Sequence, residues 1–154
     1  MGVSQGFSLL ELLVVIGIIA IAVTIGFPLL NQYAIDKNLR SAARDIAADI
    51  YNQKERAISE NRRCRIIFDV AGNSYKLQRE NDTGTAYVDL MDKTPSSFSN
   101  DIRLTGANFS GGSTITFQTR GTSSFGNLSL VNRRNYTATI TVNIAGRTNV
   151  SFSE

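Results

Sequence analysis

The apolar residues of this chain are concentrated in one continuous stretch near its N-terminus. From Phe7 to Leu30 the sequence has 24 residues, and Glu11 is the only charged residue among them. A helix of this length rises by roughly 36 Å, which is enough to cross the hydrocarbon core of a bilayer. The pattern therefore predicts a transmembrane helix over residues 7–30. Because a carboxylate inside a membrane costs roughly 2.5–3.5 kcal/mol on insertion scales, Glu11 requires a specific role.

The pattern after residue 30 is that of an amphipathic helix. Apolar residues recur at intervals of three to seven positions, with charged residues between them: Leu39, Ala43, Ile46, Ile50 and Ala57. This spacing places them along one face of an α-helix. It predicts a helix over residues 31–61 whose apolar face packs against the remainder of the chain.

Pro28 lies inside this otherwise continuous helical pattern. A proline removes one backbone hydrogen bond and clashes with the carbonyl group four residues earlier, here that of Thr24. Gly26 weakens the same turn further, because glycine is a poor helix former. We therefore expect a kink or local melting of the helix near residues 24–27.

After Asn61 the spacing of the apolar residues changes to the alternation of β-strands, with a tight turn at residues 71–73. The predicted strands are residues 64–70, 74–79, 86–91, 102–104, 114–118, 127–131, 136–144 and 147–152. In the longest of them the alternation places four apolar residues on one face: Ala138, Ile140, Val142 and Ile144. The predicted fold class is α+β, in which the second half of a long N-terminal helix packs on a small antiparallel β-sheet or sandwich domain over residues 62–154.

The composition excludes most kinds of active site. The chain has no histidine and a single cysteine, Cys64. Cysteine and histidine metal sites, an internal disulfide and the usual serine or cysteine triads therefore cannot form. We predict that the protein is not an enzyme and has no catalytic residue, metal or cofactor. Cys64 is predicted to be a small apolar strand residue, with pairing between chains as the alternative.

The residues around the start of the apolar stretch match a known signal. The short segment of residues 1–6 ends in Gly6, the apolar run begins with Phe7, and Glu11 is the fifth residue after Gly6. This resembles the class III signal of type IV pilins and type II secretion pseudopilins, many of which also have a proline at the position of Pro28. The resemblance implies a pilin-like fold, a leader peptide over residues 1–6, cleavage after Gly6 by the prepilin peptidase, and N-methylation of Phe7.

The resemblance also gives Glu11 a role. Cleavage after Gly6 creates a positively charged amine on Phe7, and in a filament of staggered subunits Glu11 of one chain would meet the Phe7 amine of another. Two opposite charges that are removed from water are tolerated when they are paired. We therefore expect Glu11 to set the register of assembly. The alternative is a plain N-terminal membrane anchor with a carboxylate near one end.

The charges that flank the apolar stretch depart from the usual form of this signal. The leader lacks the Lys or Arg that is usually found there, and the nearest positive charges, Lys37 and Arg40, follow the helix. The positive-inside rule alone would place these two residues in the cytoplasm. The class III signal implies the opposite orientation, a single-pass inner-membrane protein with its C-terminal domain in the periplasm, and we adopt that orientation.

The C-terminal third resembles a narrower group. One strand ends at Gly121, a second follows at residues 126–130, and a final strand runs into Gly146-Arg147. This order is similar to the GspH/FimT-like minor pilin group. The resemblance implies a structural minor pilin or pseudopilin that assists assembly of a type IV pilus or type II secretion pseudopilus, a periplasmic or extracellular filament. Its implied partners are other pilins or pseudopilins, the prepilin peptidase and the inner-membrane assembly platform.

A second function is suggested by the charges of this C-terminal part, which has five arginines and no acid from Ile102 to Ser153. Four of the arginines lie at predicted turns and would together form a basic patch for phosphates: Arg120, Arg133, Arg134 and Arg147. Proteins of the FimT type that bind DNA carry Gly-Arg-x-Arg where this chain has Gly-Arg-Thr-Asn at residues 146–149, so the second arginine is missing. The alternative function is DNA binding for uptake in natural transformation. Solvated turn arginines without a ligand are the other interpretation.

Overall fold

The structure, a computed structural model, describes residues 8–97 and 99–153, apart from the side chains of residues 25–31 and 96. The chain divides into two compact units, residues 1–34 and residues 35–154. The described residues form a long helix, a 3-10 turn and eight strands: α1 (Leu9–Ser59), η1 (Pro95–Ser97), β1 (Cys64–Asp69), β2 (Ser74–Glu80), β3 (Tyr87–Lys93), β4 (Arg103–Phe109), β5 (Thr114–Phe117), β6 (Gly126–Val131), β7 (Thr137–Val142) and β8 (Thr148–Ser153).

In the first unit α1 begins at Leu9, and the amide of Leu12 donates a hydrogen bond to the carbonyl of Ser8 (3.1 Å). The backbone is helical through Pro28, and the kink expected there stays a prediction. Among the described residues, no helix combines the length and the hydropathy that a membrane span requires. The span predicted over residues 7–30 includes Phe7 and several side chains that lie outside the described part of the chain.

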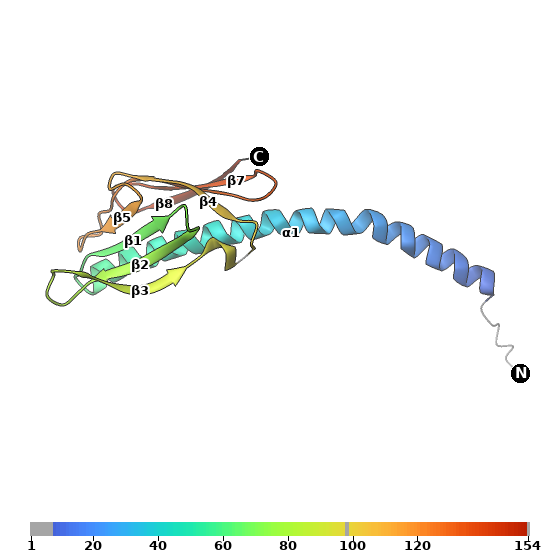
Figure 1. Ribbon diagram of the computed structural model, residues 1–154, viewed down its shortest axis with the longest axis horizontal. Coiled ribbons are helices and arrows are strands. Elements are labelled where there is room, and N and C mark those ends of the chain that lie inside the picture. The colour runs from blue at the N-terminus through green and yellow to red at the C-terminus, as the bar shows by residue number, and fades with distance from the viewer. Residues whose placement is uncertain (1–7, 98, 154) are drawn as a thin grey trace, which may run out of the picture. The chain divides into compact units, whose positions relative to one another are not determined.

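The second unit contains two antiparallel four-stranded sheets, with strand orders β3-β2-β1-β5 and β4-β6-β7-β8. Figure 1 shows the second half of α1 running alongside the strands of this unit. In the β1–β2 hairpin Cys64 pairs with Arg79 and Asp69 with Ser74, which places the turn at the predicted position. A long N-terminal helix with two antiparallel sheets confirms the predicted α+β, pilin-like class.

The hydrophobic core of the second unit is built from the apolar face of α1 and from alternate residues of both sheets. The five residues of the predicted helical stripe, from Leu39 to Ala57, are all buried, which confirms the predicted face. They share one cluster with strand residues such as Ile66 of β1 and Leu128 of β6. Every residue of this cluster lies between Leu39 and Val142, so the second unit has a complete core of its own. A unit with its own core can fold without the rest of the chain.

Asn73 connects the turn of the first hairpin to the second sheet. Its φ of 48° lies in the left-handed region, which asparagine tolerates better than most residues. Its side-chain Nδ2 donates to the carbonyl of Ile102 (2.9 Å), and its Oδ1 accepts from the amide of Leu104 (2.9 Å). The predicted turn therefore also fixes the position at which β4 starts.

A buried carboxylate joins α1 to the first sheet. Asp49 is 8% exposed and accepts hydrogen bonds from the hydroxyl of Tyr75 (2.7 Å) and from Nζ of Lys93 (2.8 Å). Burial and the hydrogen bond to Asp49 raise the pKa of Tyr75. Burial lowers the pKa of Lys93, but the hydrogen bond and charge of Asp49 outweigh it, so the net shift of that pKa is upward.

The observed strand ends lie within two residues of the predicted ones, except at the end of the fourth strand. The fourth strand covers Arg103–Phe109, although only residues 102–104 were expected, because the pairing register shifts next to Gly106 and the bulge interrupts the alternation. The seventh strand ends at Val142, and Ile144 is 61% exposed instead of lying on the buried face. The alternating pattern continues in the sequence beyond the point at which the backbone leaves the sheet.

Candidate functional site

The segment that is expected to drive assembly is exposed throughout. Every side chain from Ser8 to Thr24 is exposed, and eleven of these residues are Leu, Ile or Val. A helix that is apolar on all sides requires lipid or other protein around it, because water solvates such a surface poorly. The chain on its own provides no such cover for these described residues.

Glu11 is the one charged residue of this segment. It lies in the first turn of α1, where the free amide groups of the helix favour a negative charge. Its side chain is exposed, and it has no hydrogen bond or ion pair with any described residue. Gly6 and Phe7, the predicted cleavage and methylation sites, lie outside the described residues.

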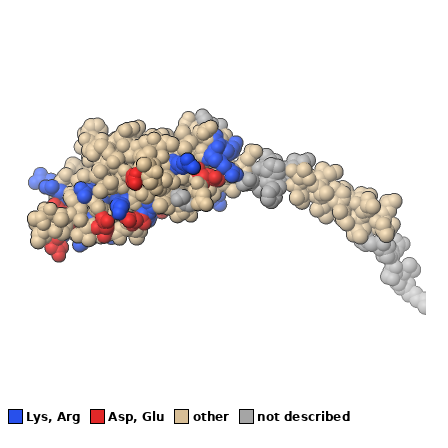
Figure 2. Space-filling view, viewed as in Figure 1, with Lys and Arg blue, Asp and Glu red and all other residues tan. Residues whose placement is uncertain are grey.

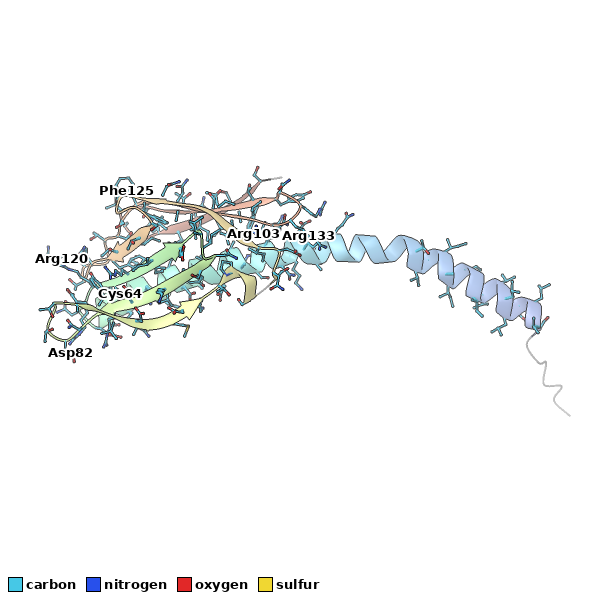
Figure 3. All side chains as sticks on the ribbon, viewed as in Figure 1. Cys64, Asp82, Arg103, Arg120, Phe125 and Arg133 are labelled. Atoms are coloured by element: carbon cyan, nitrogen blue, oxygen red, sulfur yellow. The ribbon has the colours of Figure 1, made fainter. Side chains whose placement is uncertain are left out.

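The four candidate DNA-binding arginines lie at two ends of the second unit. Figure 3 shows Arg120 at one end of the strands and Arg133 at the other. Arg134 shares the loop of Arg133, and Arg147 lies in a turn that packs against the turn of Arg120. The expectation of one basic patch is thus corrected to two separate pairs, because the turns that carry these residues are at opposite ends of the strands.

The turns that carry Arg120 and Arg147 are packed against α1. Each turn contains a glycine in the left-handed region, Gly121 with φ of 83° and Gly146 with φ of 67°. A Cβ at Gly146 would lie 2.9 Å from Cδ of Lys54 and 3.2 Å from the carbonyl oxygen of Gly121. We call Lys54, Arg120 and Arg147 the distal basic cluster. None of the three has an ion pair with a described residue.

The loop between β6 and β7 carries Arg133 and Arg134 and is fastened to α1. Nη1 of Arg134 donates to Oδ2 of Asp36 (2.8 Å), and Nδ2 of Asn132 donates to Oδ1 of the same carboxylate (3.1 Å). Arg133 lies 3.6 Å from Asp101. Part of the positive charge of this loop is therefore neutralised within the protein, in contrast to the distal basic cluster.

Cys64 is fully buried in β1, which confirms that it is a small core residue. Burial, followed by the nearby charge of Glu60, raises the pKa of the thiol to about 11. A thiol that is buried and protonated is unsuited to pairing between folded chains. In the described part of the chain, no group of three or more acidic, histidine or cysteine side chains could hold a metal ion.

One surface feature was missed by the sequence analysis. Phe125 is 54% exposed and, with Ile144, lines an open apolar groove of about 590 Å³. Figure 3 shows Phe125 toward the same end of the strands as Arg120. The sequence indicates this feature only through one large apolar residue, Phe125, within the otherwise polar loop of residues 122–127.

Two family models match the sequence. The prokaryotic N-terminal methylation motif matches residues 1–27, and the type II transport protein GspH matches residues 42–146, which is more than half of the chain. The chain belongs to the GspH family of type II transport proteins. It is a minor pseudopilin or pilin of a type II secretion or type IV pilus system, a structural and non-enzymatic class. The predicted family, the predicted function and the prediction of no enzymatic activity are confirmed.

Solved structures of minor subunits share the fold of this GspH-family chain. The minor pseudopilin EpsH from the type II secretion system of Vibrio cholerae aligns with a TM-score of 0.61 at 11% identity, over 74% of this chain and 93% of that chain. The type IV minor pilin FimU of Pseudomonas aeruginosa aligns with a TM-score of 0.58 at 16% identity, over 77% of this chain and 92% of that chain. No curated relative matches the sequence. At these identities the likeness shows the fold.

The family and the motif also identify classes of partner and the location. The GspH family implies partners in a secretion-system filament, and the methylation motif implies processing by the prepilin peptidase. The same motif implies that the GspH-family chain is anchored in the inner membrane through its N-terminal helix.

Proposed function

We propose that this GspH-family protein is held in the inner membrane by its N-terminal helix, is cleaved after Gly6 and methylated on Phe7, and then enters a filament as a minor subunit. The exposed apolar surface of residues 8–24 carries the proposal. Lipid covers this surface before assembly, and the corresponding helices of neighbouring subunits cover it afterwards. The second unit lies in the periplasm, and the inner-membrane assembly platform moves the subunit from one environment to the other.

Glu11 gives this transfer a defined register. In the filament its carboxylate accepts hydrogen bonds from the methylated Phe7 amine of a neighbouring subunit, away from water. Any other stagger of the helices leaves both charges buried without a partner, which is strongly unfavourable. The attraction between the two charges is also stronger in an apolar environment than in water. Apolar packing therefore supplies affinity, and this ion pair selects the position. The kink expected at Pro28 would ease the extraction of the helix from the bilayer.

Mass spectrometry of the protein purified from membranes and from sheared filaments tests this proposal. The expected mature chain lacks residues 1–6 and begins with N-methylated Phe7. Gly6→Val should remain uncleaved, whereas the control Gly2→Val should be processed normally. An unprocessed chain in the membrane, or the absence of the mature chain from the filament fraction, would contradict the proposal.

The distal basic cluster favours a second candidate function, DNA binding for uptake in natural transformation. The turns that carry Arg120 and Arg147 lie beside Lys54 at one end of the unit, and none of the three residues has an acidic partner among the described residues. Such groups are suited to phosphate contacts, which give DNA affinity without sequence specificity. The second arginine of the Gly-Arg-x-Arg pattern is absent, so the cluster offers fewer contacts than that pattern would.

Binding of a short DNA duplex to residues 35–154, measured as a function of salt, tests the second function. Arg120→Ala and Arg147→Ala should each weaken binding and reduce the slope of log K against log salt by about 1. Arg103→Ala, at the other end of the unit, is the control and should leave the affinity unchanged. The absence of binding at low salt, or an equal loss in the control, would exclude this function.

A further inference from the structure

The end of the second unit opposite Arg120 carries a basic surface that neither proposed function uses. Figure 2 shows Lys and Arg side chains gathered at this end, and Figure 3 labels Arg103 and Arg133 there. We call this surface the proximal collar, and it consists of Lys37, Arg40, Arg103, Arg133 and Arg134. Two of its residues belong to α1, one to β4 and two to the loop between β6 and β7.

Contacts within the unit hold these elements together. Arg103 pairs with Val131 across β4 and β6, directly before the loop that carries Arg133. Arg134 binds Asp36, the residue before Lys37 on α1.

The collar keeps most of its positive charge. The described carboxylates that pair with the collar are Asp36, bound to Arg134, and Asp101, which lies 3.6 Å from Arg133. Among the described residues, the five basic side chains and these two acids leave a net charge of +3. Lys37 and Arg103 have no hydrogen bond or ion pair from their side chains to any described residue, so they are available to an external anion.

Aromatic rings lie beside the guanidinium groups of the collar. The guanidinium carbon of Arg40 is 4.7 Å from the ring centre of Phe152, and that of Arg134 is 4.8 Å from the ring centre of Tyr136. A pocket of about 290 Å³ is lined by both rings together with Arg40 and Asp36. Positive groups mixed with aromatic rings suit the boundary between lipid headgroups and acyl chains, where both kinds of side chain are enriched.

The position of the collar in the chain keeps it close to a bilayer. Lys37 follows Leu30, the last residue of the apolar stretch, by seven residues. Seven residues span about 10 Å as a helix and at most about 25 Å when extended. The collar therefore stays within reach of the membrane surface for any orientation of the second unit. In the proposed orientation the collar is on the periplasmic side. The positive-inside rule favours Lys and Arg on the cytoplasmic side, so the charges of the collar require a role other than setting topology.

We propose that the proximal collar docks on anionic phospholipid headgroups of the periplasmic leaflet and holds the domain against the inner membrane until the subunit enters a filament. The inference rests on the membrane anchoring stated in the proposed function. Each basic residue near an anionic surface strengthens binding roughly fivefold. The attraction is screened beyond about 8 Å at physiological salt, which keeps the docking reversible. When the subunit is extracted into the filament, the domain then has to break only this surface contact with the headgroups.

Sedimentation of residues 35–154 with vesicles tests the proposal, since this unit has its own core. The vesicles contain phosphatidylcholine alone, or phosphatidylcholine with an equal amount of phosphatidylglycerol. The wild-type unit should bind the anionic vesicles and be released by added salt. Lys37→Glu with Arg103→Glu should weaken this binding at least tenfold. Arg120→Glu with Arg147→Glu makes the same change in net charge at the distal end, and it should change binding less than twofold.

Thermal unfolding of each variant verifies that it is folded, and Lys37→Gln with Arg103→Gln serves as a milder pair that should give an intermediate loss. Equal losses from the collar and distal variants, or equal binding to both kinds of vesicle, would overturn the proposal. So would collar-dependent binding of a DNA duplex without binding of vesicles. N-terminal processing is measured separately, so its failure would remove the proposed function while the vesicle result stands.

Discussion

Residues 8–24 and residues 35–59 of α1 both carry apolar side chains, but only the second stretch covers them within the chain. Ile18 is 63% exposed, whereas Ile50 is completely buried in the core. The carboxylates differ in the same way. Glu11 has no partner among the described residues, while Asp49 is buried against Tyr75 and Lys93.

This difference separates two uses of one kind of side chain. Apolar surface that is covered by the chain itself stabilises the fold, and apolar surface that is left uncovered is available for association with lipid or with other subunits. In the same way, the buried and hydrogen-bonded carboxylate of Asp49 stabilises the fold, whereas the unpaired carboxylate of Glu11 is available for association. Substitutions in the two stretches should therefore affect different measurements.

The largest expected effect is the loss of assembly in Glu11→Ala. In the proposed filament, loss of the carboxylate would leave the Phe7 amine of a neighbouring subunit without its partner, and we expect the amount of this subunit in sheared filaments to fall more than tenfold. The unfolding midpoint of the second unit should not change. Glu55→Ala is the control, because Glu55 is exposed and has no described ion pair. Normal recovery of the Glu11 variant with filaments would show that the charge does not set the register.

The next largest effect is on stability, and one substitution in each stretch tests it. Ile50→Ala should lower the free energy of unfolding of the second unit by about 2–5 kcal/mol, because it opens a cavity in the core. Ile18→Ala removes the same atoms from an exposed position and should leave that free energy unchanged. Urea unfolding of the full-length chain in detergent, followed by circular dichroism, measures both. Equal destabilisation by the two variants would contradict the conclusion that only the second stretch contributes to the fold of this unit.

Asp49→Ala should cost about 3 kcal/mol, since it leaves Lys93 and Tyr75 without their partner. Asp49→Asn should cost less, because an amide oxygen still accepts the hydrogen bond from Tyr75. Asp45→Ala is the matched control, because the contact of Asp45 with Lys93 is longer (3.4 Å) and its side chain is more exposed than that of Asp49. We expect a loss below about 1 kcal/mol. Similar losses from the two alanine variants would mean that the buried contact contributes nothing specific.

Regular patterns in the sequence were sufficient to predict the helix and its buried face. The apolar spacing from Leu39 to Ala57 identified the correct stripe, and α1 ends at Ser59, two residues before the predicted end at residue 61. Strand positions were predicted where alternation is uninterrupted. The pattern failed at Gly106, where a bulge shifts the register, and at Ile144, where alternation continues after the strand has ended.

Contacts between distant parts of the chain were beyond reach from the sequence. The burial of Asp49 depends on Lys93, which is 44 positions away and is brought close only by the packing of β3 beside α1. The separation of Arg120 from Arg133 depends on which ends of the strands their turns occupy. The roles assigned to Gly6, Phe7 and Glu11 came from the family resemblance, because periodicity alone identifies only an apolar helix.

The smallest expected effect is a loss of stability at alkaline pH that is confined to the second unit. Burial raises the pKa of Cys64 from 9.0 to about 11, and the pKa values of Tyr75 and Lys93 are also raised. A raised pKa means that the folded state holds the proton more tightly than the unfolded state. Stability is therefore complete below pH 9 and falls as the pH rises above it.

Cys64 is expected to account for the first part of this loss, because its unfolded thiol titrates before Tyr75 or Lys93. Two pH units of displacement correspond to at most about 2.7 kcal/mol between pH 9 and 11. Urea unfolding of Cys64→Ala at pH 8, 9 and 10 should give a flatter dependence on pH than the wild type, even though the variant is less stable throughout. Residues 8–24 contain no group that titrates in this range, so the association of this stretch with lipid should not change. A wild-type stability that stays constant from pH 8 to 10 would show that the buried thiol is not linked to folding.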